Sequence, residues 1–450
     1  MNHSDSEIVA SILAKEGYET STTPDGADLV LLNTCSIREK AEYTVMQRIN
    51  EMKHYKQVKP DMKVGVLGCM AERMREDLLK QKKVVDLVVG PDAYRSLPFL
   101  LDEVDGGQRA VNVLLSREET YGEIEPVRLD SNGVTAFVTI MRGCDNMCAF
   151  CVVPFTRGRE RSRDPKSIEN ECRDLVSKGF KEVTLLGQNV DSYKWAPQKT
   201  NNSGEQQAER GKEIFDFADL LALVANISPA LRVRFSTSHP KDMSDKVLEV
   251  MATHSNICNY VHLPVQSGSS AVLKRMNRGY TREWYLDRIA AIRRLMPNAA
   301  ISTDIITGFC GETEEEHQET LSLLKEVRFD MAYMFKYSER PKTLAARKYP
   351  DDVPEEVKGR RLQEVIDTVA RTSSVGNKRF IGSEQTVLIE GVSKRSAANM
   401  FGRSDRYTTV IVPKVFGNSF LAAGDYVSVQ ISSATASSLQ GEAIAIVQNG

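Results

Sequence analysis

The chain has 450 residues, 41% hydrophobic and 27% charged, and its 59 Lys and Arg against 61 Asp and Glu give a net charge of −2. This length exceeds one ordinary domain, so two or three are expected, and the composition excludes a largely disordered chain. The near-neutral charge excludes a uniformly basic nucleic-acid-binding protein, so RNA contacts would need local basic patches. The chain has neither an apolar run of membrane-spanning length nor a leader-like start, which predicts a cytoplasmic protein that does not enter membranes.

The first predicted segment, residues 1–120, alternates short apolar runs with helical stretches. Strands are expected at Leu29–Leu32, Val64–Leu67 and Val85–Val89. This alternation predicts an α/β fold with a doubly wound parallel sheet. Cys35 follows the first run and Cys69 the second, so both thiols are expected at carboxyl ends of parallel strands, where ligands bind in such sheets.

The second predicted segment, residues 130–365, repeats the alternation six times. Its strands are expected near Val134–Ile140, Val183–Leu186, Val233–Ser236, Tyr260–Leu263, Ile301–Ile306 and Met331–Phe335. Six strand–helix units predict a partial (βα)6 barrel, whose chemistry belongs on the loops at the carboxyl ends of the strands. A helix from Glu355 to about Thr372 is expected to pack on this barrel as a connector.

Three cysteines, Cys144, Cys148 and Cys151, follow the first barrel strand within eight residues, with no fourth cysteine nearby. A structural zinc site closes with four ligands, so a group of three thiolates fits zinc poorly. Three ligands instead suit a [4Fe–4S] cluster with one open iron. The alternative is that they are small core residues, which is what we expect of Cys172, Cys258 and Cys310.

Polar residues at four other strand ends could hold a cofactor. They are Gln188, Ser236, Gln266 and Asp304. The spacing of the three cysteines resembles the signature of the radical S-adenosylmethionine (SAM) superfamily. That resemblance implies that residues at the carboxyl ends of the barrel strands could hold the ribose, adenine and carboxylate of SAM. Caps and turns also use these residue types, so that alternative stays open.

The third predicted segment, residues 380–448, has short β-rich runs punctuated by glycines, which predicts a small β-barrel. Two groups of basic residues are candidates for RNA contact. The first is Arg157 and Arg159, in a row of alternating arginines that continues to Arg163. The second lies in the tail and consists of Lys394, Arg395 and Arg403. An ion-paired arginine row is the alternative for the first group. For Tyr407, beside the second group, core packing is the alternative to stacking on RNA.

Together these motifs resemble the radical SAM methylthiotransferase family over essentially the whole chain. Asn33–Glu39 and Gly68–Glu72 look like its amino-terminal cluster domain, Met141–Arg163 like its radical SAM loop, and the tail like a TRAM domain, an RNA-binding β-barrel. Within the family, Arg142–Phe155 and Gly187–Tyr193 are most similar to the branch that acts on isopentenyladenosine in tRNA. They fit less well the branch that acts on a ribosomal protein or the branch that acts on threonylcarbamoyladenosine.

The resemblance implies SAM and two [4Fe–4S] clusters as cofactors, with no catalytic side chain beyond the cluster ligands. One cluster is expected on Cys144, Cys148 and Cys151. An auxiliary cluster is expected on three amino-terminal cysteines, two of which match Cys35 and Cys69. The third ligand of the family pattern would lie just before Met1, so we interpret the chain as truncated there, without that cysteine and the first strand.

The implied activity is addition of a methylthio group to C2 of N6-isopentenyladenosine beside the tRNA anticodon. The implied partners are a tRNA anticodon loop bearing isopentenyladenosine and a reductant such as flavodoxin or ferredoxin, and a monomer is expected. Two alternatives remain open. The chain could belong to a branch acting on a ribosomal protein or a different modified adenosine, or it could bind RNA and SAM without inserting sulfur.

Overall fold

The structure is a computed structural model of the chain and describes residues 1–36, 39–129, 131–200, 206–208 and 214–447. The chain forms two compact units. The first contains residues 1–130, 141–163 and 340–344, and the second contains 131–140, 164–339 and 345–450. The segment with the three clustered cysteines therefore packs with the amino-terminal residues. The division into segments 1–120, 130–365 and 380–448 stays a prediction, and its limits at 130 and 448 fall outside the described residues.

The first unit is built on a parallel four-stranded sheet in the order β1-β2-β3-β4. Its elements are α1 (Asn2–Lys15), β1 (Leu29–Thr34), α2 (Glu39–Val58), β2 (Lys63–Gly68), α3 (Cys69–Met74), α4 (Glu76–Gln81), β3 (Leu87–Val89), η1 (Tyr94–Ser96), α5 (Leu97–Asp105), β4 (Ala110–Asn112), β6 (Met141–Arg142), α6 (Val153–Thr156) and β7 (Arg161–Ser162). The three predicted strands are present, within two residues at each end.

Helices cover both faces of this sheet, as a doubly wound arrangement requires. Because successive side chains of a strand point to opposite faces, each strand contributes to two cores. Leu87 and Val89 pack with α1 and α5, whereas Val88 packs with α2, α3 and α4. The apolar runs that predicted the strands are thus buried on both sides, which is typical of parallel sheets.

The second unit contains six parallel strands in chain order. Its elements to the end of the last strand are β5 (Thr135–Thr139), α7 (Pro165–Ser177), β8 (Glu182–Leu186), η2 (Val190–Ser192), β9 (Lys194–Trp195), β10 (Gln198–Thr200), β11 (Gln206–Ala208), β12 (Phe215–Asp216), α8 (Phe217–Ala225), β13 (Arg232–Ser236), η3 (Pro240–Asp242), α9 (Asp245–Thr253), β14 (Tyr260–His262), α10 (Ser270–Arg275), α11 (Arg282–Leu295), β15 (Ala300–Thr307), α12 (Glu314–Val327) and β16 (Met331–Lys336). Strands β5, β8 and β13 form one ladder and β14, β15 and β16 another, and a bridge between Val233 and Ile257 joins them. This is the predicted partial (βα)6 barrel.

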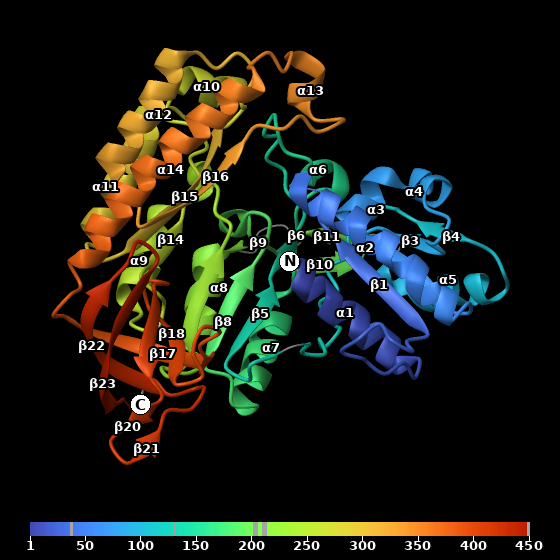
Figure 1. The fold of residues 1–450 in the computed structure, drawn as a ribbon, viewed down its shortest axis with the longest axis horizontal. Coiled ribbons are helices and arrows are strands. Elements are labelled where there is room, and N and C mark those ends of the chain that lie inside the picture. Colours follow the sequence, from blue (N-terminus) through green and yellow to red (C-terminus); the bar gives the residue numbers. More distant parts are fainter. Residues whose placement is uncertain (37–38, 130, 201–205, 209–213, 448–450) are drawn as a thin grey trace. The chain divides into compact units, whose positions relative to one another are not determined.

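Helices α11 and α12 cover the outside of the later strands together with α14 (Glu355–Lys378), as Figure 1 shows. A short helix, α13 (Leu344–Lys348), precedes α14 in the chain. The connector helix was predicted to end near Thr372 and continues for another six residues. Its predicted apolar face is buried at Val365 and Val369. None of the described helices combines the length and the apolar character needed to cross a bilayer.

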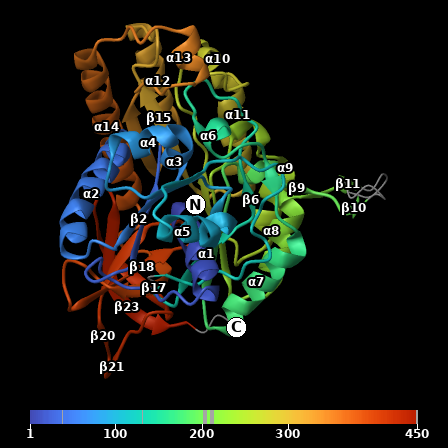
Figure 2. The same cartoon turned by 90° about the vertical axis from the view of Figure 1, so that its right-hand side faces the viewer.

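The tail forms a closed barrel in the order β17-β18-β19-β23-β22, as predicted. Its strands are β17 (Glu384–Val392), β18 (Asn399–Ser404), β19 (Thr409–Pro413), β22 (Tyr426–Ala434) and β23 (Ser438–Ile446), and β20 (Val415–Phe416) with β21 (Ser419–Phe420) forms a hairpin that extends from one end of it (Figures 1 and 2). Strand β18 was not predicted because Gly402 interrupts its apolar pattern. A Cβ at Gly402 would lie 2.2 Å from the carbonyl oxygen of Leu388, so the close pairing of β17 and β18 requires glycine.

Arginines of β13 hold the C-terminal barrel against the (βα)6 barrel within this unit. Arg232 donates a 2.8 Å hydrogen bond to the carbonyl oxygen of Arg403. Arg234 donates to the carbonyls of Ser404 and Asp405 at 2.6 and 3.0 Å. Arg234 is nearly fully buried and its charge is balanced by Glu182 at 2.9 Å. The junction is therefore a buried polar network, which orients its members more strictly than apolar contact does.

Candidate functional site

The three clustered cysteines lie on a loop whose two ends are joined by a short antiparallel strand pair, β6 with β7, which we call the neck. Arg142 of β6 pairs with Arg161 of β7, and the N–H of Cys144 donates to the carbonyl of Gly158 at 3.2 Å. Gly143 has φ +80°, and a Cβ there would lie 2.0 Å from the carbonyl oxygen of Arg159. Only glycine can occupy this crossing point without moving the loop.

The thiols on this loop are buried or half-buried. Cys144 and Cys148 are buried and Cys151 is partly exposed. The N–H of Val153 lies 3.5 Å from the sulfur of Cys151 and donates to it. Burial raises the pKa of the Cys144 thiol, and its neighbours Cys151 and Cys148 raise it further. Three thiols on one short loop can serve together as ligands of a metal centre, whose positive charge compensates the thiolates.

Cys35 and Cys69 lie at the carboxyl ends of adjacent parallel strands, as predicted. Thr34 and Gly68 are partners in the register of β1 and β2, and each is followed directly by its cysteine. The hydroxyl of Thr34 donates to the carbonyl of Leu67 at 2.6 Å and accepts from the N–H of Met70 at 3.2 Å, which fixes the two strand ends together. Adjacent strands are about 5 Å apart, so the two cysteines can serve one ligand. Residues 37 and 38 of the predicted motif lie outside the described residues.

Two carboxylates of the first unit anchor the cysteine loop. Asp5 of α1 binds Arg142 at 2.9 Å and Arg157 at 2.7 Å. Asp92, which follows β3, binds Arg161 at 2.8 Å. Burial alone would raise the pKa of Asp5, but the two arginines outweigh it and hold that pKa below its ordinary value. Neither carboxylate could be predicted from a local sequence pattern, because the ion pairs join residues far apart in the chain.

These contacts correct one expectation about RNA. Arg157 was predicted to contact phosphate, but it is buried and ion-paired with Asp5, so it is not available at the surface. The arginines do not share one extended face, because α6 and a turn at Gly158 precede β7. Arg159 remains a candidate. Its side chain is 78% exposed and pairs with Asp145 at 2.6 Å.

The four predicted SAM residues lie at strand ends of the second unit, where they form two neighbouring pairs. Gln188 follows β8 and Ser236 ends β13, the strand beside it. The N–H of Gln266 donates to the carbonyl of Asp304 at 2.9 Å, which joins the other two. Gln266 has φ +77°, a strained conformation for a residue with a side chain and one that is concentrated at functional sites.

The first of these pairs lies in a buried polar environment that the sequence analysis missed. Among the described residues, the side-chain oxygen of Gln188 is buried without a hydrogen-bond donor, and the buried carboxylate of Asp191 lies beside the hydroxyl of Ser238 and the backbone N–H of His239. Burial raises the pKa of Asp191 to about 7, with a smaller contribution from Asp242. Thr237 has φ +80° in the same loop. Unsatisfied polar atoms and backbone strain together are typical of a ligand site.

In the C-terminal barrel, Lys394 and Arg395 are exposed on the turn after β17. Arg403 is partly exposed, forms an ion pair with Glu390, and lies over the ring of Tyr407. That ring also packs on Tyr260, 4.9 Å between centroids. Tyr407 therefore belongs to the junction of the two barrels, the alternative left open by the sequence.

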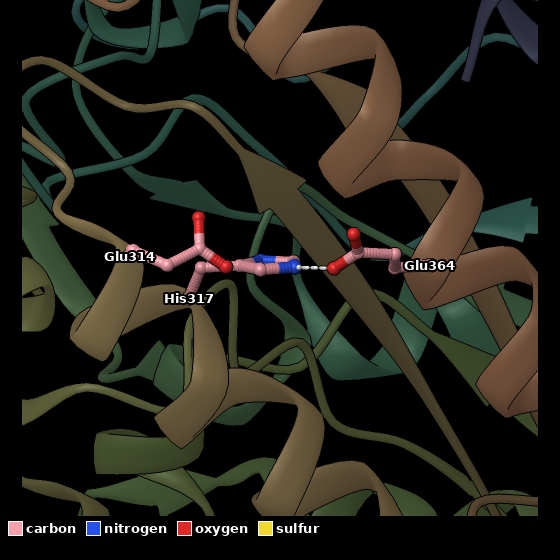
Figure 3. A group of neighbouring side chains, drawn as sticks. All are labelled: Glu314, His317 and Glu364. Atoms are coloured by element: carbon pink, nitrogen blue, oxygen red, sulfur yellow. Dashed lines mark hydrogen bonds and ion pairs between the residues drawn. The ribbon is translucent and has the colours of Figure 1, made fainter.

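A further group of potential metal ligands joins α12 and α14. Glu314 and His317 of α12 point toward Glu364 of α14, and His317 lies 2.8 Å from Glu364 (Figure 3). Arg360 binds both carboxylates at 2.7 Å, and its hydrogen bond to Glu314, with one from Gln318, lowers the pKa of Glu314 to about 2. The guanidinium already supplies the positive charge that these carboxylates need, so the group is an ion-pair network between two helices.

Three known families match separate parts of the chain. Residues 1–90 match the Uncharacterized protein family UPF0004, residues 138–324 the Radical SAM superfamily, and residues 378–444 the TRAM domain. Over all 450 residues the chain is 56% identical to the tRNA-2-methylthio-N(6)-dimethylallyladenosine synthase of Christiangramia forsetii, covering 93% of that protein. The chain belongs to this family. The enzyme of the same name from Amoebophilus asiaticus is 55% identical over 443 residues, which is 98% of this chain and 90% of that enzyme. The one from Bacteroides fragilis is 51% identical over 444 residues, which is 99% of this chain and 93% of that enzyme.

The matches agree with the site geometry. The superfamily match contains Cys144, Cys148 and Cys151, and the amino-terminal match contains Cys35 and Cys69. Membership in the radical SAM superfamily implies SAM and a [4Fe–4S] cluster as cofactors. Among solved structures, the radical SAM methyltransferase TsrM from Kitasatospora setae has a TM-score of 0.55 and 14% identity, covering 76% of this chain and 70% of that one. At this identity the likeness shows the fold alone.

Proposed function

We propose that the protein adds a methylthio group to C2 of N6-isopentenyladenosine beside the anticodon of tRNA by radical SAM chemistry. The observation that carries the proposal is the 56% identity to a synthase of this modification over the whole chain. The cysteine loop adds a physical reason, since its three thiols are held together by the β6–β7 neck. No side-chain general base is needed for this reaction.

The loop residues suit a [4Fe–4S] cluster. Cys144, Cys148 and Cys151 would ligate three irons and leave one free for SAM, and the N–H of Val153 would support the thiolate of Cys151. When bound, this cluster supplies the electron that cleaves SAM and thereby the radical that activates the adenine C2–H bond. The protein's own contribution is to hold the ligands and to keep water from the site.

Gln188, Ser236, Gln266 and Asp304 would orient SAM from the strand ends of the (βα)6 barrel. The backbone of Gln266 is strained, and its N–H donates to the carbonyl of Asp304. This contact supports the proposal that Gln266 and Asp304 hold SAM in a fixed position. A second, auxiliary [4Fe–4S] cluster would use Cys35 and Cys69. Their adjacent strand ends supply two thiols on one edge of the sheet.

The RNA surface would use Lys394, Arg395 and Arg403 of the C-terminal barrel together with Arg159. Their positive charges would contact phosphate, whereas the target base must leave its stack, which costs least in a single-stranded loop. The partner is therefore a tRNA anticodon loop, with flavodoxin or ferredoxin as reductant. The proposed setting is the cytoplasm and the proposed state a monomer.

The test is an anaerobic reconstitution followed by incubation with SAM, a reductant and tRNA that carries isopentenyladenosine. We expect methylthio-isopentenyladenosine in the digested tRNA by mass spectrometry. The triple variant Cys144→Ala, Cys148→Ala, Cys151→Ala should lose about four irons and all product. Cys172→Ala, which alters a buried cysteine outside the motifs, is the matched control and should keep both.

Other outcomes assign other functions. Methylthiolation of a different adenosine or of a ribosomal protein would place the protein in another branch. Cleavage of SAM without any sulfur insertion would indicate a protein that binds RNA and SAM but does not transfer sulfur. Retention of all iron in the triple variant would refute the radical assignment.

A further inference from the structure

The β20–β21 hairpin that extends from the C-terminal barrel has one face on the barrel and the other in solvent (Figures 1 and 2). Phe416 of β20 packs on the barrel core, and Leu421, directly after β21, is buried in that core. Val415 and Phe420 are cross-strand partners on the opposite face, where they are 60% and 69% exposed. The hairpin is therefore fixed by one face and presents an aromatic ring on the other.

Basic side chains surround this ring. The Nζ of Lys414 lies 5.8 Å from the centroid of the Phe420 ring, which is within the range of a cation–π contact. The backbone of Lys414 joins the hairpin to the turn after β17, because its N–H donates to the carbonyl of Ala398 at 2.8 Å. That turn carries Lys394 and Arg395, both exposed. Two neighbouring segments of the barrel thus bring three cations and one exposed ring to the same end of it.

The charge of these two segments is positive without compensation. Residues 391–399 and 413–421 contain the three basic residues and no Asp or Glu, although the whole chain has a net charge of −2. Among the described residues none of the three forms an ion pair, whereas Arg403 on the neighbouring strand pairs with Glu390. The charge favours an anionic partner and the ring a planar one. Unpaired nucleotides offer both, since each has a phosphate and a base whose face stacks on aromatic side chains.

We propose that an unpaired base of the bound tRNA stacks on the ring of Phe420, with Lys394, Arg395 and Lys414 beside the adjoining phosphates. The proposal rests on the tRNA substrate of the proposed function and adds a contact that holds a base rather than phosphate alone. A stacked base needs no particular sequence, because every base has a π-face. Phe420 therefore contributes affinity for unpaired RNA without restricting which base is bound.

The stacked base is a different nucleotide from the one that is modified. The C-terminal barrel is attached at the amino-terminal ends of β8 and β13, where the hydroxyl of Tyr426 donates to the carbonyls of Lys181 and Ala230, each at 3.2 Å. The proposed SAM residues lie at the carboxyl ends of the same strands, where the chemistry of such barrels takes place. The hairpin extends from the attached barrel, so Phe420 holds the RNA at a second point.

The test measures binding of tRNA that carries isopentenyladenosine to the reconstituted full chain, without SAM. Phe420→Ala and Phe420→Leu should each weaken binding by about 5- to 150-fold, the equivalent of about 1–3 kcal/mol for one stacked base. Leucine keeps an apolar side chain without a ring, so equal losses separate stacking from simple apolar contact. Neither change removes a charge, so the slope of log affinity against log salt should stay the same. Phe420→Trp keeps a ring and should bind normally, and tRNA should quench the fluorescence of the indole that it introduces.

Phe99→Ala is the matched control. Phe99 is 64% exposed on α5, where Asp102 and Glu103 follow it by one helical turn, so its loss should leave tRNA affinity unchanged. A long RNA duplex is the matched probe, because it has phosphates but no unpaired base, and it should quench the Phe420→Trp protein much less than tRNA does.

Unchanged tRNA affinity in Phe420→Ala would overturn the inference and would leave the ring to a protein partner. Equal quenching by tRNA and by the duplex would also overturn it, as would normal binding in Phe420→Leu. Absence of tRNA binding by the unmutated protein would overturn the inference together with the proposed function. Failure of the proposed function alone is seen as intact tRNA binding without a methylthio product.

Discussion

Asp5 is the most informative single position for the architecture of the site, because its carboxylate binds two arginines of the cysteine loop and is fully buried. Asp5→Asn preserves the shape and removes the charge. Breaking a buried ion pair by removing one partner costs about 3–5 kcal/mol. At about 1.4 kcal/mol for each factor of ten, the loop should open roughly 10² to 4 × 10³ times more often.

Hydrogen exchange followed by mass spectrometry measures this directly in peptides that cover residues 141–163. We expect their protection to fall by that factor in Asp5→Asn, with peptides of the second unit unchanged. The pKa of Asp5 is held below its ordinary value, so its stabilisation is fully present above about pH 4 and is lost as the pH falls through the folded pKa. Protection in the unmutated protein should therefore show no loss from this group between pH 5 and pH 8.

Asp145→Asn provides the control, since Asp145 forms the same kind of pair with Arg159 at 2.6 Å but in solvent. An exposed pair contributes about 0–1 kcal/mol, so protection should hardly change. If the two variants lose protection equally, burial does not determine the strength of these pairs and the anchoring argument is wrong.

Four further changes test other parts of the structure. Asp191→Asn should raise the thermal midpoint more at pH 8 than at pH 5. The pKa of Asp191 is about 7, so the native state binds a proton between about pH 4 and pH 7, and the unmutated protein loses up to about 4 kcal/mol of folding stability as the pH rises through that range. A larger gain in the midpoint at pH 5 would contradict this. Gly143→Ala places a Cβ 2.0 Å from a carbonyl oxygen and should cost about four irons in the reconstituted protein, whereas full loading would show that the neck tolerates displacement. Arg234→Gln removes donors to two carbonyls of the C-terminal barrel and should give that barrel a separate, lower unfolding transition by calorimetry, which the exposed change Arg395→Gln should not do. Lys394→Ala with Arg395→Ala should reduce the slope of log affinity for tRNA against log salt by about 1.4–1.8 while SAM cleavage persists; an unchanged slope would remove these residues from the RNA surface.

The strands and their ends were readable from the sequence because the parallel strands are buried on both faces and appear as continuous apolar runs. The cysteines could be placed for the same reason. A residue that directly follows such a run lies at the carboxyl edge of the sheet, and Cys35 and Cys69 do so in matching register. The connector helix was equally visible from its apolar periodicity, although its last six residues were not.

The role of Arg157 could not be read in this way. Alternation predicts a shared face only in an extended segment, and here a helical turn ends at Thr156 and Gly158 adopts φ +70°. The partner of Arg157 is also 152 residues away in the chain, beyond any local pattern. Asp191 was missed for a related reason, since its buried setting depends on the loop after the neighbouring strand.

The contact of β13 with the C-terminal barrel has an evolutionary consequence. Arg232 and Arg234 donate to main-chain oxygens at residues 403–405, and these oxygens are present whatever side chains the positions carry. Substitutions in this strand and turn can therefore accumulate without loss of the attachment. The outward surface of the barrel is free to diverge toward different RNA sequences while its orientation on the enzymatic core is inherited unchanged.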